Sequence, residues 1–200
     1  MDEGRFRAVR HKSLAAAGLG SEAVDVSLDG NALILTGLAG ARRAFPAARI
    51  SRVRFGYEQN KYAGKLYQMQ VWSADAPGPL VLRTIQEDNT AFAAIARALA
   101  AAVAAAHGPG AVEGGLGWAA ALGPVLWMTA IIPAAMILPG LETTHRGHED
   151  PFWLVALVIA AFAIPLIGVM LWFFYRPYRP RRLTDPAALD AYLPGGAGDD

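Results

Sequence analysis

The chain has 200 residues, enough for one or two domains. Hydrophobic residues make up 54% of it and charged residues only 18%, below the roughly 25% of an average soluble protein. A net charge of +1, without basic runs interleaved with aromatic residues, argues against nucleic-acid binding. The absence of cysteine excludes disulfides, thiolate catalysis and Cys-ligated metal sites.

The first thirteen residues, MDEGRFRAVRHKS, are polar and charged, and no apolar stretch follows that could serve in a cleavable signal peptide. We therefore predict that residues 1–20 form a basic N-terminal segment. A separate soluble domain is predicted to follow it over residues 21–108.

Short runs of alternating apolar and polar residues predict the strands of this domain. Asp29-Gly30 lies between two such runs, which strongly indicates a tight hairpin turn. About six strands at this spacing favour an antiparallel sheet, sandwich or barrel. The predicted strands cover residues 24–28, 32–36, 42–45, 49–57, 66–73 and 80–85.

A helix is predicted after the last strand, because apolar residues recur there with helical spacing. Asp88 or Asn89 can cap its first turn, and Gly108 ends it. Its apolar face should cover a sheet face or an open barrel end. This face consists of Phe92, Ile95, Leu99 and Val103.

A basic cluster lies within the predicted strands, with Glu58 as the only acid in its 24 residues. It can form a face held against anionic lipid headgroups or an acidic partner. The same residues can equally be the solvated faces of ordinary strands. The cluster consists of Arg42, Arg43, Arg49, Arg52, Arg54, Lys61 and Lys65.

Two later segments, residues 114–141 and 151–175, contain no charged residue. Each exceeds the roughly 20 apolar residues that a helix needs to cross a bilayer. We predict two transmembrane helices joined by a polar outer loop, residues 142–150. His145 and His148 in this loop could ligate a divalent ion, but a loop between two spans is polar in any case. We therefore predict neither a metal site nor a cofactor.

The distribution of arginine predicts the orientation of the hairpin. Four arginines follow the second span, whereas the outer loop has only Arg146. By the positive-inside rule, the tail, residues 176–200, and the N-terminal domain both face the cytoplasm. The chain is then an integral protein of a bacterial cytoplasmic (inner) membrane. The four arginines are Arg176, Arg179, Arg181 and Arg182.

Strands in this order, followed by one helix and a transmembrane hairpin, resemble bacterial membrane proteins with an N-terminal pleckstrin-homology-like (PH-like) domain. The stretch ARISRVRFGYEQNKYAGKLYQMQVW, residues 48–72, looks like the middle hairpin of such domains. The resemblance implies a PH-like α+β fold with a C-terminal capping helix, and a binding or scaffolding role. The first hairpin loop, Asp29-Gly30-Asn31, lacks the basic residues that phosphoinositide-binding members carry there.

No nucleophile, zinc or phosphate-loop motif of known enzymes occurs in the chain, so no catalytic residue is predicted. We predict a non-enzymatic module that acts as a scaffold or adaptor. Its partners would be the lipid bilayer and a membrane protein or a second copy of the chain. One alternative is a sensor of anionic lipid that uses the basic cluster, and another is an unrecognised membrane enzyme.

Overall fold

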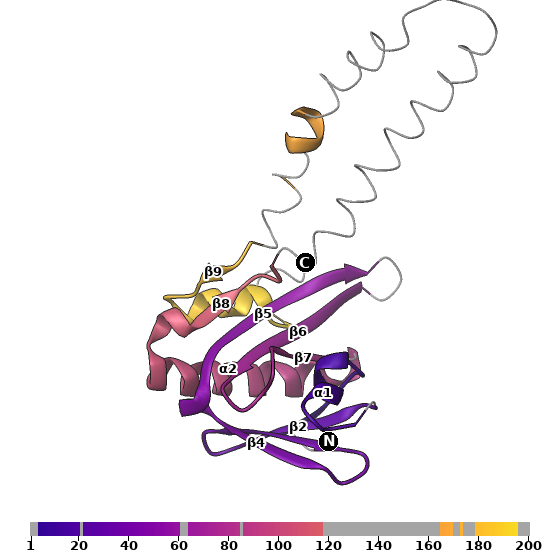
Figure 1. The fold of residues 1–200 in the computed structure, drawn as a ribbon. Helices are drawn as coiled ribbons and strands as arrows, with labels where there is room; N and C mark the ends of the chain where they lie inside the picture. Colours follow the sequence, from indigo (N-terminus) through magenta and orange to yellow (C-terminus); the bar gives the residue numbers. More distant parts are fainter. Residues whose placement is uncertain are drawn as a thin grey trace, which may run out of the picture. The chain divides into compact units, whose positions relative to one another are not determined.

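The computed structural model describes residues 4–20, 22–60, 64–84, 86–117, 165–169, 173 and 179–195. The chain divides into two compact units (Figure 1). The first combines Met1–Leu116 with Pro180–Asp200, and the second is Gly117–Arg179. The first unit is an α+β domain with two sheets, as the sequence predicts.

The first sheet is a four-stranded antiparallel meander in the order β1-β2-β3-β4. β1 is Arg5–Ala8, β2 is Val24–Asp29, β3 is Ala32–Gly37 and β4 is Arg42–Pro46. A short helix, α1 (Lys12–Ala16), lies between β1 and β2 in the chain. Asp29 pairs with Ala32 across the turn, and Gly30 there has a φ of 56°, so the predicted hairpin is confirmed.

The second sheet has five strands in the order β7-β6-β5-β8-β9. β5 (Ile50–Asn60), β6 (Gly64–Ser73) and β7 (Leu80–Arg83) form an antiparallel meander. β8 (Val112–Gly114) then runs parallel to β5, and β9 (Arg181–Arg182) runs antiparallel to β8. A 3-10 turn, η1 (Ala47–Arg49), connects the two sheets along the chain.

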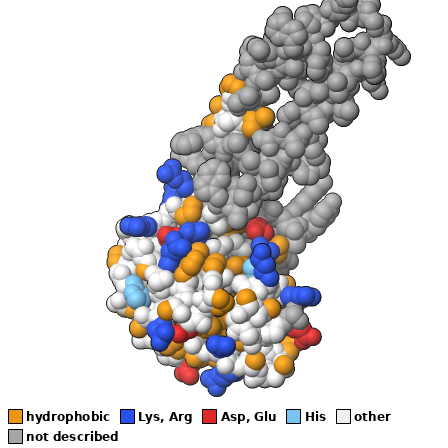
Figure 2. All heavy atoms as spheres, viewed as in Figure 1, with side chains coloured by type: hydrophobic (Ala, Val, Ile, Leu, Met, Phe, Trp, Pro, Cys, Tyr) orange, Lys and Arg blue, Asp and Glu red, His pale blue; other side chains and the backbone are white. Residues whose placement is uncertain are grey.

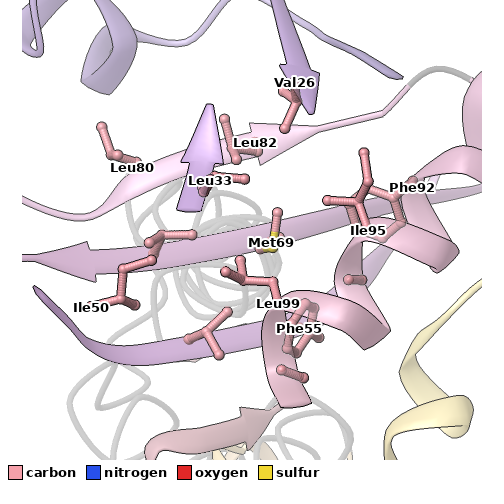
Figure 3. Packing of buried hydrophobic residues seen from close by; sticks show 14 of the residues in the cluster. Val26, Leu33, Ile50, Phe55, Met69, Leu80, Leu82, Phe92, Ile95 and Leu99 are labelled. Carbon is pink, nitrogen blue, oxygen red and sulfur yellow. The ribbon is translucent and has the colours of Figure 1, made fainter. Parts of the chain in front are cut away.

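The long helix α2, Asn89–His107, packs against strands of both sheets. The four residues of its predicted apolar face are all buried, together with Ala93, Ala96 and Ala100. They join a hydrophobic core with Val26 and Leu33 of the first sheet and with Phe55 and Met69 of the second (Figure 3). Among the described helices, α2 alone is long and apolar enough to cross a membrane, and its burial in this core accounts for that composition.

The expected side-chain cap of α2 is absent. Asp88 occupies the N-cap position but makes no cap hydrogen bond, and its Oδ2 accepts the backbone N–H of Arg7 at 2.9 Å instead. A 3-10 turn, η2 (Gln86–Asp88), leads into the helix. At the other end Gly108 has a φ of 84° and ends the helix, as the sequence predicts.

The domain begins before residue 21, where the sequence analysis placed its boundary. β1 pairs with β2 in register Phe6↔Val26, and both Phe6 and Ala8 are buried. The rings of Phe6 and Phe92 pack edge to face, with 5.2 Å between their centres. In β1 only two apolar residues alternate with arginines, and so short a pattern cannot be distinguished from a charged segment. The sequence analysis therefore placed the start of the domain too late.

The chain also returns to this domain after residue 179. β9 pairs with β8 in register Gly114↔Arg181 and Glu113↔Arg182, and a 3-10 helix, η5 (Pro186–Tyr192), follows. Leu189 and Leu193 are buried at 5% and 2% exposure in the core that α2 also enters. These residues were predicted to belong to a separate tail, residues 176–200, but residues 180–200 are part of the first unit.

In the second unit, residues 165–169 are helical. Leu166, Val169 and Phe173 are 62%, 54% and 66% exposed, respectively. They belong to the second predicted span. The rest of that span, nearly all of the first span and the outer loop lie outside the described residues.

Replacing Leu189 by Ala should destabilise the first unit by about 2–3 kcal/mol, because a buried leucine in the returning segment loses its core contacts. Urea unfolding of the full chain in mild detergent measures this change. The other four tryptophans are first replaced by Phe so that the fluorescence reports Trp72 of β6.

Ala188→Ser, at an exposed position of the same 3-10 helix, is the matched control and should leave the midpoint nearly unchanged. Equal midpoints for all three chains would mean that the returning segment does not contribute to the stability of the domain.

Candidate functional site

The most distinctive region of the domain is the set of strands at which the chain leaves it and returns. β8 lies beside β5 in register Val53↔Val112 and Phe55↔Gly114, and the backbone N–H of Gly115 donates to the Phe55 carbonyl oxygen at 2.8 Å. β9 then lies on the other side of β8. We call β8 and β9 the exit strands, because the chain leaves the domain after one and re-enters at the other.

Two glycines allow the close packing of these strands. A Cβ on Gly56 of β5 would lie 2.6 Å from a methyl carbon of Leu116, and a Cβ on Gly114 would clash with ring carbons of Tyr192. Leu116 is buried, so the chain is held against β5 up to the last residue before the second unit begins. These contacts fix the point of departure from the domain.

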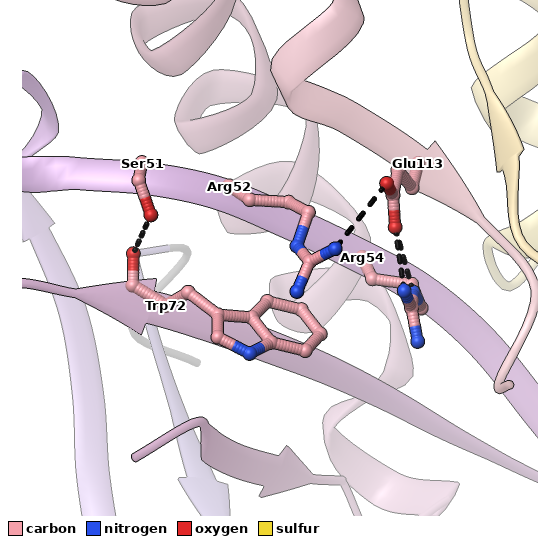
Figure 4. A network of polar contacts seen from close by, with 5 residues as sticks. All are labelled: Ser51, Arg52, Arg54, Trp72 and Glu113. Carbon is pink, nitrogen blue, oxygen red and sulfur yellow. Dashed lines mark hydrogen bonds and ion pairs between the residues drawn. The ribbon is translucent and has the colours of Figure 1, made fainter. Parts of the chain in front are cut away.

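A polar network joins β8 to the outer face of β5 (Figure 4). Arg54 Nε and Nη2 both donate to Glu113 Oε2, at 2.9 and 2.7 Å, and these two side chains are only 13% and 12% exposed. Arg52, which is 38% exposed, lies farther away, with Nη1 3.6 Å from Glu113 Oε1. A single carboxylate therefore serves two guanidinium groups, and Arg54 has the stronger bond.

Trp72 on the neighbouring strand β6 completes this network. The guanidinium carbon of Arg52 lies 4.0 Å from the centre of the Trp72 ring, and that of Arg54 lies 5.0 Å away. The β5–β6 register shifts between Ile50 and Arg52, and Ser51 Oγ donates to the Trp72 carbonyl oxygen at 3.3 Å. The indole face is thus occupied by the two arginines, an arrangement that attraction between cations and aromatic rings favours.

The structure separates the other members of the predicted basic cluster. Arg42 and Arg43 lie exposed on β4, in the sheet that contains neither exit strand. Arg49 pairs with Asp75 at 2.6 Å. Lys65 Nζ lies 5.2 Å from the centre of the Tyr57 ring, and Lys61 lies outside the described residues. On the face shown in Figure 2, basic side chains are scattered among other types rather than gathered in one patch.

Two cavities are lined by described residues of the domain. One, of about 340 Å³, lies between α2 and the returning segment and is lined mostly by apolar atoms, with the Arg97–Asp190 pair among its lining residues. The other, of about 430 Å³, is a wider hollow lined by the β2–β3 turn, the start of η1 and the last turns of α2.

The histidines occupy separate places. His107, in the last turn of α2, lies with Nε2 3.2 Å from the Ala47 carbonyl oxygen. His11 Nδ1 accepts the backbone N–H of Ser13 and caps α1. His145 and His148 lie outside the described residues. Within the described part of the chain, no group of three His, Asp or Glu is placed to hold a metal ion.

The sequence analysis did not single out Glu113 or the pairing of β9 with β8. Glu113 stands alone among small residues, and a three-residue strand gives no measurable period. The only available signal is the turn chemistry of Gly108-Pro109 shortly before it, which shows where α2 ends but not where the chain goes next.

Comparison of the chain with protein-family models, with curated proteins and with solved structures found no match. The class of the protein is therefore defined by its own fold. It is a two-sheet α+β domain into which the second unit is inserted between two hydrogen-bonded neighbouring strands.

Glu113→Gln should destabilise the domain by about 2 kcal/mol, because the nearly buried Arg54 loses its counter-charge and a charge-assisted hydrogen bond. Asp190→Asn removes one partner of an ion pair that is about half exposed, 49% and 47% for the two side chains, and should cost much less. Urea unfolding followed through Trp72 compares the two variants, and equal losses would contradict a special role for Glu113.

Acid should weaken the attachment of α1 to β7. Burial, then Arg83 and Lys12, lowers the pKa of His11 below 6.5. Its neutral Nδ1 can accept from the Ser13 hydroxyl at 2.8 Å while the backbone N–H of Val81 donates to that hydroxyl at 2.9 Å. The unfolded chain binds the proton at the higher pH, so this contribution is complete above pH 6.5 and is lost as the pH falls through the lowered pKa.

His11→Asn keeps a capping oxygen without a titrating group. We expect the unfolding midpoint of the native chain to fall, relative to this variant, as the pH drops below 6.5. Parallel pH profiles for the two chains would show that His11 does not contribute.

Proposed function

We propose that this protein is a non-enzymatic, membrane-tethered PH-like module that acts as a scaffold or adaptor for a membrane protein partner. The observation that carries the proposal is the pairing of β8 with β9. It makes residues 117–179 an insertion with both ends anchored on adjacent strands of one sheet.

This pairing restricts how the insertion can meet a membrane. Because hydrogen-bonded neighbours lie on the same side of a bilayer, the chain between them crosses an even number of times or not at all. Two helices of about 20 residues each satisfy this condition within the two uncharged segments. The pairing therefore supports a hairpin over a single span.

Exposed side chains and charges support the same arrangement. Leu166, Val169 and Phe173 are each more than half exposed in the second predicted span, which suits contact with lipid. The arginines that follow this span favour a cytoplasmic tail, and β9 would hold the domain on the same side. The domain would then face the cytoplasm at the inner membrane of a bacterium.

The order of elements supports the PH-like assignment. Two antiparallel meanders, β1–β4 and β5–β7, are followed by one helix that packs against strands of both sheets. Two features go beyond that pattern, namely α1 between the first two strands and the extension of the second sheet by β8 and β9.

The polar contacts favour a binding module over a lipid sensor built on the predicted cluster. Arg49, Arg52 and Arg54 already pair with acidic side chains of the domain. These ion pairs, and the stacking of Arg52 and Arg54 on Trp72, hold side chains in place. They do not form an arrangement that would transfer a proton to or from a substrate. Anchoring at the membrane raises the effective concentration of the module beside other membrane proteins, so weak contacts suffice for recruitment.

Single cysteines test both the topology and the partner, since the native chain contains none. We expect Arg146→Cys to react with a membrane-impermeant maleimide in intact cells. Leu38→Cys and Ala188→Cys, at exposed positions of the domain, should react only after permeabilisation. Labelling of the domain cysteines in intact cells would contradict the cytoplasmic orientation.

The same domain cysteines then carry a photo-crosslinker in native membranes. Purification through a C-terminal tag should recover one protein in a fixed ratio, also when residues 117–179 are replaced by an unrelated transmembrane hairpin. An untagged chain is the control. Recovery of the chain alone, or only with copies of itself, would contradict the adaptor role.

A further inference from the structure

The strand β9 lies at the edge of the second sheet, where the chain re-enters the domain. Its partner Gly114 lies three residues before Gly117, the first residue of the other unit. Adjacent strands lie about 4.8 Å apart and each residue advances about 3.3 Å. Arg181 is therefore within roughly 10 Å of the point at which the chain leaves the domain.

Arg181 and Arg182 are also exposed, and no described ion pair includes them. Glu113, the strand partner of Arg182, is already bonded to Arg54. The described arginines of the predicted cluster either have an acidic partner or lie in the other sheet. Arg49, Arg52 and Arg54 have acidic partners, and Arg42 and Arg43 lie in the sheet without exit strands.

The direction of the strands places a further basic residue at the same end of the sheet. Because β8 is parallel to β5, it runs towards the end of β5 that turns into β6. Lys65 pairs with Gln59 close to that turn, with its ammonium near the Tyr57 ring. A lysine beside a tyrosine is typical of the interface between water and lipid headgroups.

We propose that β9 is a binding surface for anionic lipid headgroups, with Arg181 and Arg182 as its main ligands. Guanidinium groups offer paired donors that match the oxygens of a phosphate. Arg181 and Arg182 are consecutive on β9, so their side chains leave the strand on opposite faces, and both are exposed. Both lie beside the exit point, where a headgroup phosphodiester would be if residues 117–179 span the bilayer. The inference rests on the proposed membrane hairpin and assigns lipid contact to residues other than the predicted cluster.

The test uses the full chain reconstituted in vesicles of phosphatidylcholine mixed with phosphatidylglycerol. Lipids retained after purification in mild detergent are measured by mass spectrometry. We expect phosphatidylglycerol to be enriched on the native chain and the enrichment to fall on the order of tenfold in the Arg181→Gln, Arg182→Gln double variant. High salt during purification should reduce the enrichment on the native chain.

Arg42→Gln with Arg43→Gln removes the same charge from an exposed strand of the other sheet, and should keep the enrichment. Arg181→Lys with Arg182→Lys should retain most of it, because the charge stays. Urea unfolding through Trp72 checks that each variant folds. Equal enrichment for the native chain and the β9 glutamine variant, or equal losses for the two glutamine variants, would overturn the proposal.

Extraction with alkaline carbonate tests the proposed membrane hairpin separately from the lipid surface. If alkaline carbonate releases the native chain from the vesicles, the chain is not an integral membrane protein and the proposed function itself fails. If the chain stays with the vesicles but the β9 variant keeps its lipid, only the lipid surface is wrong.

Discussion

The contact on which the architecture depends is the pairing of β8 with its neighbours on both sides. β5 holds it through parallel hydrogen bonds and through the Arg54–Glu113 pair, and β9 holds it through two residue pairs. Without this short strand, the second sheet would end at β5, and β9 would lose the strand with which it pairs. Three residues thus connect the core of the domain to both ends of the insertion. The near burial of Glu113 makes this connection electrostatic as well as hydrogen-bonded.

Some elements of the domain are determined by residues close together in the sequence, and others by contacts between distant residues. Most strands, the Asp29-Gly30 turn and the buried face of α2 follow from residues close together in the sequence, and they could be predicted. Asp88 shows the limit of such reasoning: it stands at the N-cap of α2, but its carboxylate is taken by the backbone of Arg7, 81 residues away in the chain. β1, β8 and β9 have four, three and two residues and depend on partners far along the chain, so no period in the sequence could reveal them.

The basic cluster illustrates the same limit for the candidate site. Crowding of seven cations along the sequence suggests one charged face, but a strand alternates its side chains and the cluster spans two sheets. Glu113 and Asp75 come from outside the cluster and pair with three of its members. The sequence identifies which residues carry charge, whereas the fold decides which charges remain exposed. Arg181 and Arg182 owe their exposure to their place on an edge strand.

The order of β8 and β9 in the chain has a consequence for biosynthesis. The ribosome releases β9 only after all of residues 117–179, whereas β1–β8 and α2 have already emerged. Most of the domain can therefore fold early. Its last strand, and the leucines of the returning segment that pack near α2, can join only after the insertion has been synthesised. If the insertion spans a membrane, as we propose, joining of β9 to β8 also requires both of its ends on one side of that membrane. Under that proposal, a chain with the two ends on opposite sides would leave Leu183, Leu189 and Leu193 without their buried sites. Completion of the sheet would then report that the insertion has crossed the membrane correctly.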